Sequence, residues 1–241
     1  MIEKDKSYFI NYPIFLKYKT RFNLLKMTRI KQLKKVFINE RIAELPFVFR
    51  NLPSKLDSKI LDLGCSESSL SLHMASIGYK VFGVDMRDFP YKHPNFNFVK
   101  SDIMNLSFPD SSFDAVCCIS TLEHVGLGFY SDNPLDEKPD KKAMGQIIRV
   151  LKKGGTLILS VPFGVYKKTK QQRIYDLERL KALLENFIIE EKIFLADFTH
   201  PVNNYWKEVS LQDAEKIESA QGRTNCLCMV KAKKADFLQQ L

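Results

Sequence analysis

The feature that most constrains the fold is a regular alternation of short apolar runs and amphipathic stretches between residues 59 and 231. The apolar runs suit buried strands, and the stretches between them have helical spacing. Repeated strand–helix units of this length favour right-handed crossovers and a sheet covered by helices on both faces. We therefore expect an α/β fold with a doubly wound, mostly parallel sheet. Strands are predicted at 59–63, 79–84, 95–100, 113–119, 156–161, 187–194 and 224–231, and helices at 67–76, 140–151 and 173–186.

Polar residues and one glycine follow the predicted strands at their carboxyl ends, the edge at which parallel sheets bind ligands. Gly64 follows the first strand and lets the backbone turn sharply beside a ligand. Asp85 ends the second, where a carboxylate can accept hydrogen bonds from ribose hydroxyls. Asp102 follows the third and can accept from an exocyclic amine, while Ile103 gives a base apolar cover. Together they predict a site for a nucleoside with an amino-acid tail.

Two common phosphate-binding motifs are absent. The dinucleotide pattern G-x-G-x-x-G requires glycines where this chain has Ser66 and Ser69, which disfavours a NAD-type site. The sequence also lacks G-x-x-x-x-G-K, so P-loop chemistry is disfavoured.

An ordered series of segments resembles the class I S-adenosylmethionine (SAM) dependent methyltransferases. The series runs from Ile60 to about Phe194: ILDLGC, GVDMRD, VKSDIMNLSFPDSSFDAVCCISTLEHV and RVLKKGGTLILSVP. Within that superfamily the chain is similar to the type 11 group. STLEHVGLGFYSD and QRIYDLERLKALLENF further resemble bacterial and archaeal methyltransferases of glycan or polysaccharide pathways.

The resemblance implies a Rossmann-like sheet of seven strands with an antiparallel last strand, and SAM as the cofactor. It implies that Asp85 binds the ribose, that Asp102 and Ile103 hold adenine, and that Ser120 lies beside the sulfonium. The rest of the predicted cofactor set is Asp62, Gly64, Cys65, Ser66 and Met86. The chain departs from the family at Ser66 and Ser68, where further glycines are usual; a serine there can hydrogen-bond the SAM carboxylate or cap the helix.

Methyl transfer from a sulfonium depends mostly on positioning, and a base helps when the acceptor is a hydroxyl. His124 is the candidate base because imidazole titrates near neutral pH, and Glu123 stands beside it. The alternative is that both residues only cap a helix or line the pocket.

Two further segments are candidates for acceptor binding. The stretch 126–139 is rich in glycine, proline and acids, and is predicted to be a lid or a plain surface loop. Its Phe129, Tyr130 and Asp132 suit a sugar or polyol. Arg173 and Tyr175 suit an acidic or phosphorylated acceptor, unless they only begin a helix.

The basic residues are concentrated at the N-terminus. Residues 1–56 hold 13 lysines and arginines against 4 acids, a net charge of +9 that equals that of the whole chain. Apolar residues from Phe22 to Phe37 have helical spacing. We therefore predict a basic helical arm over 1–56 and a methyltransferase domain over 57–241. The arm suits nucleic acid or an anionic membrane surface, packing on the domain, or pairing in a homodimer.

Composition bounds the remaining possibilities. The 241 residues, 45% of them hydrophobic, suit one domain with an arm. Five cysteines without a C-x-x-C pair argue against disulfides and a metal site, and predict a reducing compartment. With neither an apolar leader nor a membrane span in the sequence, we expect a soluble cytoplasmic protein.

The predicted function is methyl transfer from SAM to an oxygen, with nitrogen as second choice, of a small-molecule or saccharide acceptor. One alternative is an RNA methyltransferase that docks through the arm. Against it, the chain lacks an Asn-Pro-Pro-Tyr motif after the fourth strand and a Pro-Cys nucleophile. Another alternative is a SAM-binding partner subunit without turnover, because of Ser66 and Ser68.

Overall fold

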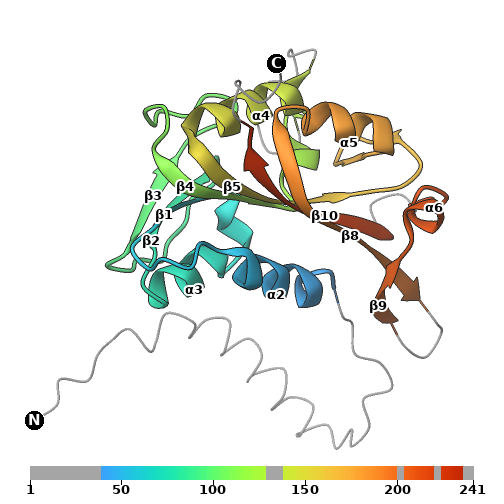
Figure 1. Cartoon of the computed structure of the whole chain (residues 1–241), viewed down its shortest axis with the longest axis horizontal. Helices are drawn as coiled ribbons and strands as arrows, with labels where there is room; N and C mark the ends of the chain where they lie inside the picture. The colour runs from blue at the N-terminus through green and yellow to red at the C-terminus, as the bar shows by residue number, and fades with distance from the viewer. Residues whose placement is uncertain (1–38, 129–137, 200–203, 220–223, 236–241) are drawn as a thin grey trace, which may run out of the picture.

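The computed structural model describes residues 39–128, 138–199, 204–219 and 224–235. Eight strands form the main sheet in the order β3-β2-β1-β4-β5-β10-β8-β9 (Figure 1). They are β1 (Lys59–Leu63), β2 (Lys80–Asp85), β3 (Phe96–Lys100), β4 (Phe113–Ile119), β5 (Leu151–Pro162), β8 (Phe187–Thr199), β9 (Asn204–Val209) and β10 (Cys226–Lys234). A separate pair consists of β6 (Lys167–Lys168) and β7 (Arg173–Ile174).

The pairing confirms the predicted α/β class and the mostly parallel sheet. β3, β2, β1, β4 and β5 pair in parallel, whereas β10 is antiparallel to both β5 and β8. The last strand is therefore antiparallel, as expected. The strand order reverses between β1 and β4, and ligands bind at such a switch point in open α/β sheets.

The structure corrects three element predictions. The sheet has an eighth strand, β9, which pairs with residues 194–199 and so extends β8 beyond its predicted end. The helix predicted from 173 begins only at Leu177, because Arg173 and Ile174 pair with β6 instead. The helix predicted from 67 begins at Leu70, after a short 3-10 turn.

Helices cover both faces of the sheet (Figure 1). α2 (Arg41–Asn51) and α3 (Leu70–Ser76) lie on one face, and α4 (Pro139–Val150) and α5 (Leu177–Leu183) lie on the other. A short helix, α6 (Leu211–Ala214), follows β9. The central strand β4 is buried on both sides because its alternate residues enter different cores: Val116 and Cys118 face α4, while Ala115 and Cys117 face α2 and α3.

α2 lies within the segment predicted to be an arm, yet it packs on the sheet. Phe47 and Val48 are buried in the same core as α3 and β1. The apolar series from Phe22 to Phe37 lies outside the described residues, so its helical character and its role in pairing stay predictions. The boundary near residue 56 also stays a prediction.

All five cysteines are buried free thiols, and burial raises the pKa of each one. Across the described ranges, no helix is both long and apolar enough to cross a membrane. The same ranges hold no group of three or more histidine, cysteine or acidic residues arranged for a metal ion.

The packing of α2 can be tested with two substitutions on that helix. Phe47→Ala empties a site in the core and should lower the free energy of unfolding by about 3 kcal/mol in denaturant titration. Ile42, which is 58% exposed on the same helix, is the control, and Ile42→Ala should change it by no more than about 0.5 kcal/mol. Equal, small effects of both changes would show that α2 does not belong to the core.

Candidate active site

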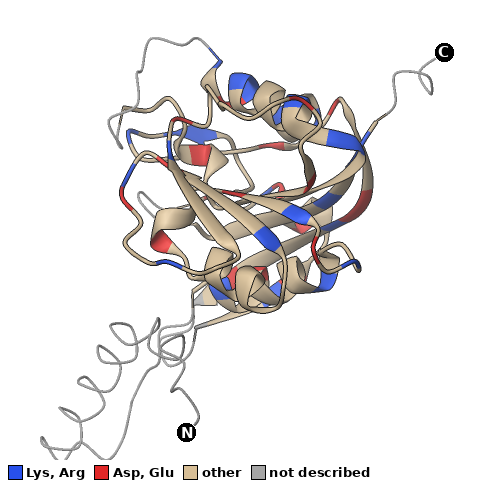
Figure 2. Ribbon diagram, turned by 90° about the vertical axis from the view of Figure 1, so that its left-hand side faces the viewer, with Lys and Arg blue, Asp and Glu red and all other residues tan. Residues whose placement is uncertain are grey.

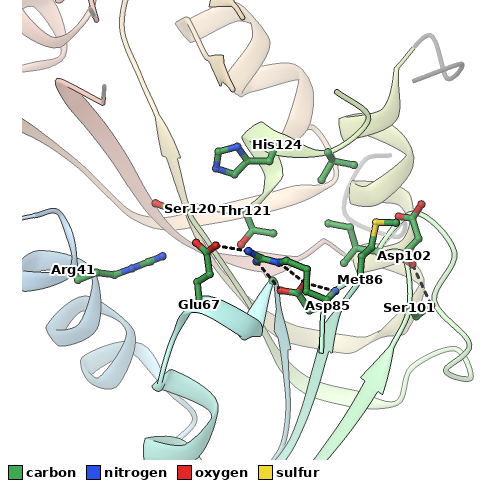
Figure 3. A pocket seen from close by; sticks show the side chains of 13 residues that line it. Arg41, Glu67, Asp85, Met86, Ser101, Asp102, Ser120, Thr121 and His124 are labelled. Atoms are coloured by element: carbon green, nitrogen blue, oxygen red, sulfur yellow. Dashed lines mark hydrogen bonds and ion pairs between the residues drawn. The ribbon is translucent and has the colours of Figure 1, made fainter. Parts of the chain in front are cut away.

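A pocket of about 660 Å³, counting its part open to solvent, lies at the carboxyl ends of β1, β2 and β4 (Figure 3). The lining residues are Arg41, Gly64, Glu67, Asp85, Met86, Arg87, Ser101, Asp102, Ile103, Ser120, Thr121, His124 and Val125.

The turn after β1 requires glycine. Gly64 has a φ of 78°, and its N–H donates to the Val84 carbonyl oxygen at 2.8 Å. A Cβ at this position would lie 2.2 Å from Oγ1 of Thr121, which follows β4. The missing side chain therefore lets the β1 turn and the β4 turn close against each other at the floor of the pocket.

Asp85 is held as a charged carboxylate at the end of β2. Oδ2 accepts from the Ser66 N–H at 3.0 Å and from Arg87 Nη2 at 3.2 Å, while Oδ1 accepts from the Arg87 N–H at 2.9 Å and from its Nε at 3.1 Å. Burial raises the pKa of Asp85, but these hydrogen bonds and the guanidinium charge outweigh it and bring the pKa below its ordinary value. Arg87 also forms an ion pair with Glu67 across the pocket (Figure 3).

This network sets a condition for ribose binding. A carboxylate offers about four lone-pair positions, and four hydrogen bonds already reach Asp85. Two come from backbone N–H groups and two from the Arg87 side chain. A diol that donates to both oxygens therefore has to replace side-chain hydrogen bonds of Arg87.

The other end of the pocket suits an aromatic base. Asp102 Oδ1 accepts from the Met104 N–H at 2.8 Å, and its Oδ2 receives no hydrogen bond from the residues that the structure describes. Ile103, which is buried, and Met86 supply apolar surface beside it. An exocyclic amine can donate to the second oxygen of Asp102.

The turn after β4 is held by a carboxylate from α2. Ser120 has a φ of 43°, and its Oγ donates to Glu44 Oε1 at 2.6 Å. Ser160 Oγ donates to the same oxygen at 2.6 Å and accepts from the Ser120 N–H at 2.9 Å. Glu44 Oε2 accepts from Arg41 Nη1 at 2.6 Å.

His124 lies at the pocket wall with a defined tautomer. Its Nδ1 is 2.6 Å from the Gln171 carbonyl oxygen, which can only accept, so Nδ1 carries the proton and Nε2 has the lone pair. Burial lowers the pKa of His124, and the hydrogen bond to Gln171 opposes this only in part. The imidazole is therefore neutral near pH 7 and able to accept a proton.

Glu123 points into the protein and does not line the pocket. It is 2% exposed, and its Oε2 has no hydrogen-bond partner among the described residues. Burial, reinforced by the charge of Glu44, raises its pKa to about 8. Its Oε1 lies 3.8 Å from His124 Nε2.

Seven residues predicted for the cofactor or the chemistry line this one pocket: Gly64, Asp85, Met86, Asp102, Ile103, Ser120 and His124. Three others lie next to it. Asp62 is buried and accepts a hydrogen bond from Ser71 Oγ at 2.5 Å. Cys65 is also buried, and the Ser66 N–H donates a hydrogen bond to Asp85.

The residues predicted to bind the acceptor are less accessible. Arg173 and Tyr175 are 5% and 1% exposed; Arg173 Nη1 donates to the Val125 carbonyl oxygen at 2.5 Å, and Tyr175 O–H donates to Asp140 at 3.2 Å. Both support the His124 turn from inside, and their contact with an acceptor stays a prediction. Phe129, Tyr130 and Asp132 lie outside the described residues.

Sequence reasoning missed several pocket residues. Arg87 and Thr121 directly neighbour predicted residues, so their place after β2 and β4 was a usable signal. Glu67 lies in the turn after β1. No local sequence pattern marks Arg41 and its partner Glu44 as residues of the site. They lie on α2, which precedes the first strand and reaches the pocket only in the folded structure.

Comparison with known proteins finds a match to the segment that holds most of this pocket. Residues 61–159 match the family described as a methyltransferase domain, and this segment contains most of the pocket. The strand-end pocket thus lies almost wholly within a segment that is similar to methyltransferase domains.

Individual relatives match at modest identity. Sterol 24-C-methyltransferase of Neurospora crassa is 32% identical over 127 residues, which are 47% of this chain and 28% of that protein. An uncharacterized protein of Methanocaldococcus jannaschii is 25% identical over 229 residues, covering 81% of this chain and 88% of that one. A SAM-dependent methyltransferase structure from Methanosarcina mazei superposes with a TM-score of 0.54 at 21% identity, covering 78% and 97%. The chain thus spans under a third of the sterol enzyme.

The buried acid Glu123 predicts a pH-dependent stability. Its pKa of about 8 in the folded state lies above the unfolded value, so folding loses stability as pH rises from about 4.5 through 8. Glu123→Gln removes this loss and should be more stable than wild type by about 1–3 kcal/mol at pH 9. Thermal unfolding from pH 5 to 9 checks this.

The gap between Glu123→Gln and wild type should close at pH 5, and the exposed Glu185→Gln should show none at any pH. A constant gap across the range would contradict the burial of an uncharged Glu123.

Proposed function

We propose that this chain transfers the methyl group of SAM to an oxygen, with nitrogen as second choice, of a small-molecule or saccharide acceptor. The observation that carries this is that Asp102, Asp85 and Ser120 lie in this order across one pocket in Figure 3, with Ile103 and Gly64 among the other lining residues. This order suits adenine, ribose and an amino-acid tail in sequence.

The cofactor is supported by the chemistry of these groups. Asp85 is a buried acceptor for a diol, Asp102 has an oxygen for an amine, and Gly64 lets the turn after β1 close against Thr121 at the floor of the pocket. When bound, SAM supplies a methyl group already activated by the positive charge on sulfur. The chain's own task is to hold the acceptor in line and to exclude competing geometries.

An oxygen acceptor is favoured by His124. A hydroxyl must lose its proton as it is methylated, and the Nε2 lone pair of neutral His124 can take that proton. The Gln171 carbonyl fixes the ring, while Arg173 and Tyr175 hold the turn from below. These contacts hold the imidazole of His124 in a fixed orientation at the pocket wall.

A small acceptor is favoured over nucleic acid by the described surface. Blue (Lys, Arg) and red (Asp, Glu) stretches are interspersed along the ribbon of the described residues in Figure 2. The pocket lies at the carboxyl ends of parallel strands, where open α/β sheets bind small ligands. An RNA acceptor would depend on the basic segment, which lies mostly outside the described residues.

The cofactor assignment predicts the effect of Asp85. Asp85→Asn leaves an amide that donates toward the ribose and Arg87, so the Kd for S-adenosylhomocysteine (SAH) in calorimetry should rise about tenfold or more, a loss of about 1.4 kcal/mol. Asp88→Asn is the matched control: its carboxylate is 84% exposed and pairs with Lys100, and its Kd should stay at the wild-type value. SAH affinity unchanged in Asp85→Asn would refute the ribose assignment.

The base assignment predicts a separate effect of His124. His124→Gln should lower kcat by about 10²–10⁴ with an oxygen acceptor, while SAH affinity stays the same. Wild-type kcat/KM should fall as His124 gains a proton, at a pH below its ordinary 6.5 because burial lowers the pKa.

The assay is labelled methyl transfer to saccharide, lipid-linked and RNA acceptors between pH 5 and 8. The fall of kcat/KM at low pH should be absent in His124→Gln. An identical pH profile in that variant would contradict the role as base, and label in RNA alone would contradict the acceptor class.

A further inference from the structure

The end of the pocket opposite Asp102 carries a cation that the sequence analysis did not assign. Arg41 reaches the pocket from α2, and Figure 3 shows its side chain pointing toward Ser120 and Glu67. Asp102 lies at the far side of Asp85 in the same view. A ligand with its base at Asp102 and its ribose at Asp85 therefore extends its tail toward Arg41.

Glu44 fixes the position of this arginine. The Glu44 carboxylate is fully buried, and a buried charge is tolerated only with hydrogen-bonding partners. It has three: the hydroxyls of Ser120 and Ser160 at 2.6 Å, and Arg41 Nη1 at 2.6 Å. The same carboxylate thus sets both the turn after β4 and the orientation of the guanidinium.

The ion pair leaves the binding edge of Arg41 available. Only Nη1 contacts Glu44, and Nε and Nη2 form no hydrogen bond with any residue in the described ranges. These two N–H groups are the parallel donors with which arginine binds a carboxylate in bidentate fashion. The Arg41 side chain is 30% exposed, so a ligand in the pocket can reach it.

The charges around Arg41 suit a zwitterion. Glu44 and Glu40 raise the pKa of Arg41 in opposition to burial, so the guanidinium stays charged. The Arg41 guanidinium and Glu67, which pairs with Arg87, therefore share this end of the pocket. An α-amino acid presents one charge of each sign, whereas a simple anion would meet the acids unfavourably.

We propose that Arg41 binds the carboxylate of the amino-acid tail of SAM, and that Glu44 is a positioning residue that orients Arg41. This inference rests on the proposed function, since it takes the cofactor as given. It makes α2 part of the cofactor site, although α2 lies outside the segment that matches the methyltransferase family.

The test compares two ligands that differ only at the tail. SAH carries the amino-acid tail, whereas 5′-deoxy-5′-methylthioadenosine has the same nucleoside and sulfur without it. Calorimetry with both ligands is done on full-length wild type, Arg41→Met, Arg41→Lys and Glu44→Gln. Arg50→Met is the control, because Arg50 is an exposed arginine on the same helix that pairs with Glu191.

Arg41→Met should raise the Kd for SAH about tenfold or more and leave that for methylthioadenosine within about twofold. Arg41→Lys keeps the charge but loses the paired donors, and should weaken SAH by about threefold to tenfold. Glu44→Gln should also raise the Kd for SAH and leave the Kd for methylthioadenosine unchanged. Arg50→Met should change the Kd of neither ligand. Methylthioadenosine binding also reports that each variant is folded; if Glu44→Gln does not fold, the two Arg41 variants carry the test.

Three results would overturn the inference. Unchanged SAH binding in Arg41→Met would show that Arg41 does not contact the tail. An equal loss of both ligands would show a general disturbance of the pocket. If wild type binds neither ligand, the proposed function itself fails; if it binds both and Arg41→Met behaves as wild type, only the role of Arg41 fails.

Discussion

The parallel alignment of β1, β2, β3 and β4 is the constraint on which the site depends. It brings the carboxyl ends of four strands to one edge of the sheet, at the point where the strand order reverses. Gly64, Asp85, Asp102 and Ser120 therefore line one pocket although they are far apart in the sequence. Gly64 and Ser120 directly follow β1 and β4, Asp85 ends β2, and Asp102 lies two residues after β3. An error in the order of these strands would therefore disperse all four residues.

This constraint also explains which parts of the site the sequence could predict. Asp85 and Asp102 stand directly after apolar runs, and a local pattern is enough to place them. The contact of Glu44 with Ser120 and Ser160 joins residues 76 and 116 positions apart. Neither the basic composition of that segment nor its helical spacing distinguishes a buried carboxylate at the pocket from a solvated one.

Among the strands and helices, too, some could be predicted from a local sequence pattern, whereas others depend on contacts made only in the folded protein. The strands and the parallel core were predictable from buried apolar runs, but β9 was not, because NYWKEV gains its partner only where β8 continues past residue 194. Arg173 resembles the start of a helix in the sequence. It is instead in β7, where its guanidinium holds the turn that carries His124. Positioning contacts of this kind depend on the assembled fold.

The central claim is that the strand-end pocket binds SAM, and hydrogen exchange with mass spectrometry tests it most directly. Saturating SAH should slow backbone exchange at residues 64–68, 85–88, 101–104 and 120–125, because these turns close around the ligand. Backbone exchange in α5, which lies on the opposite face of the sheet from α2 and α3, should be unchanged. Protection confined to segments outside these four turns, or none at all, would contradict the account.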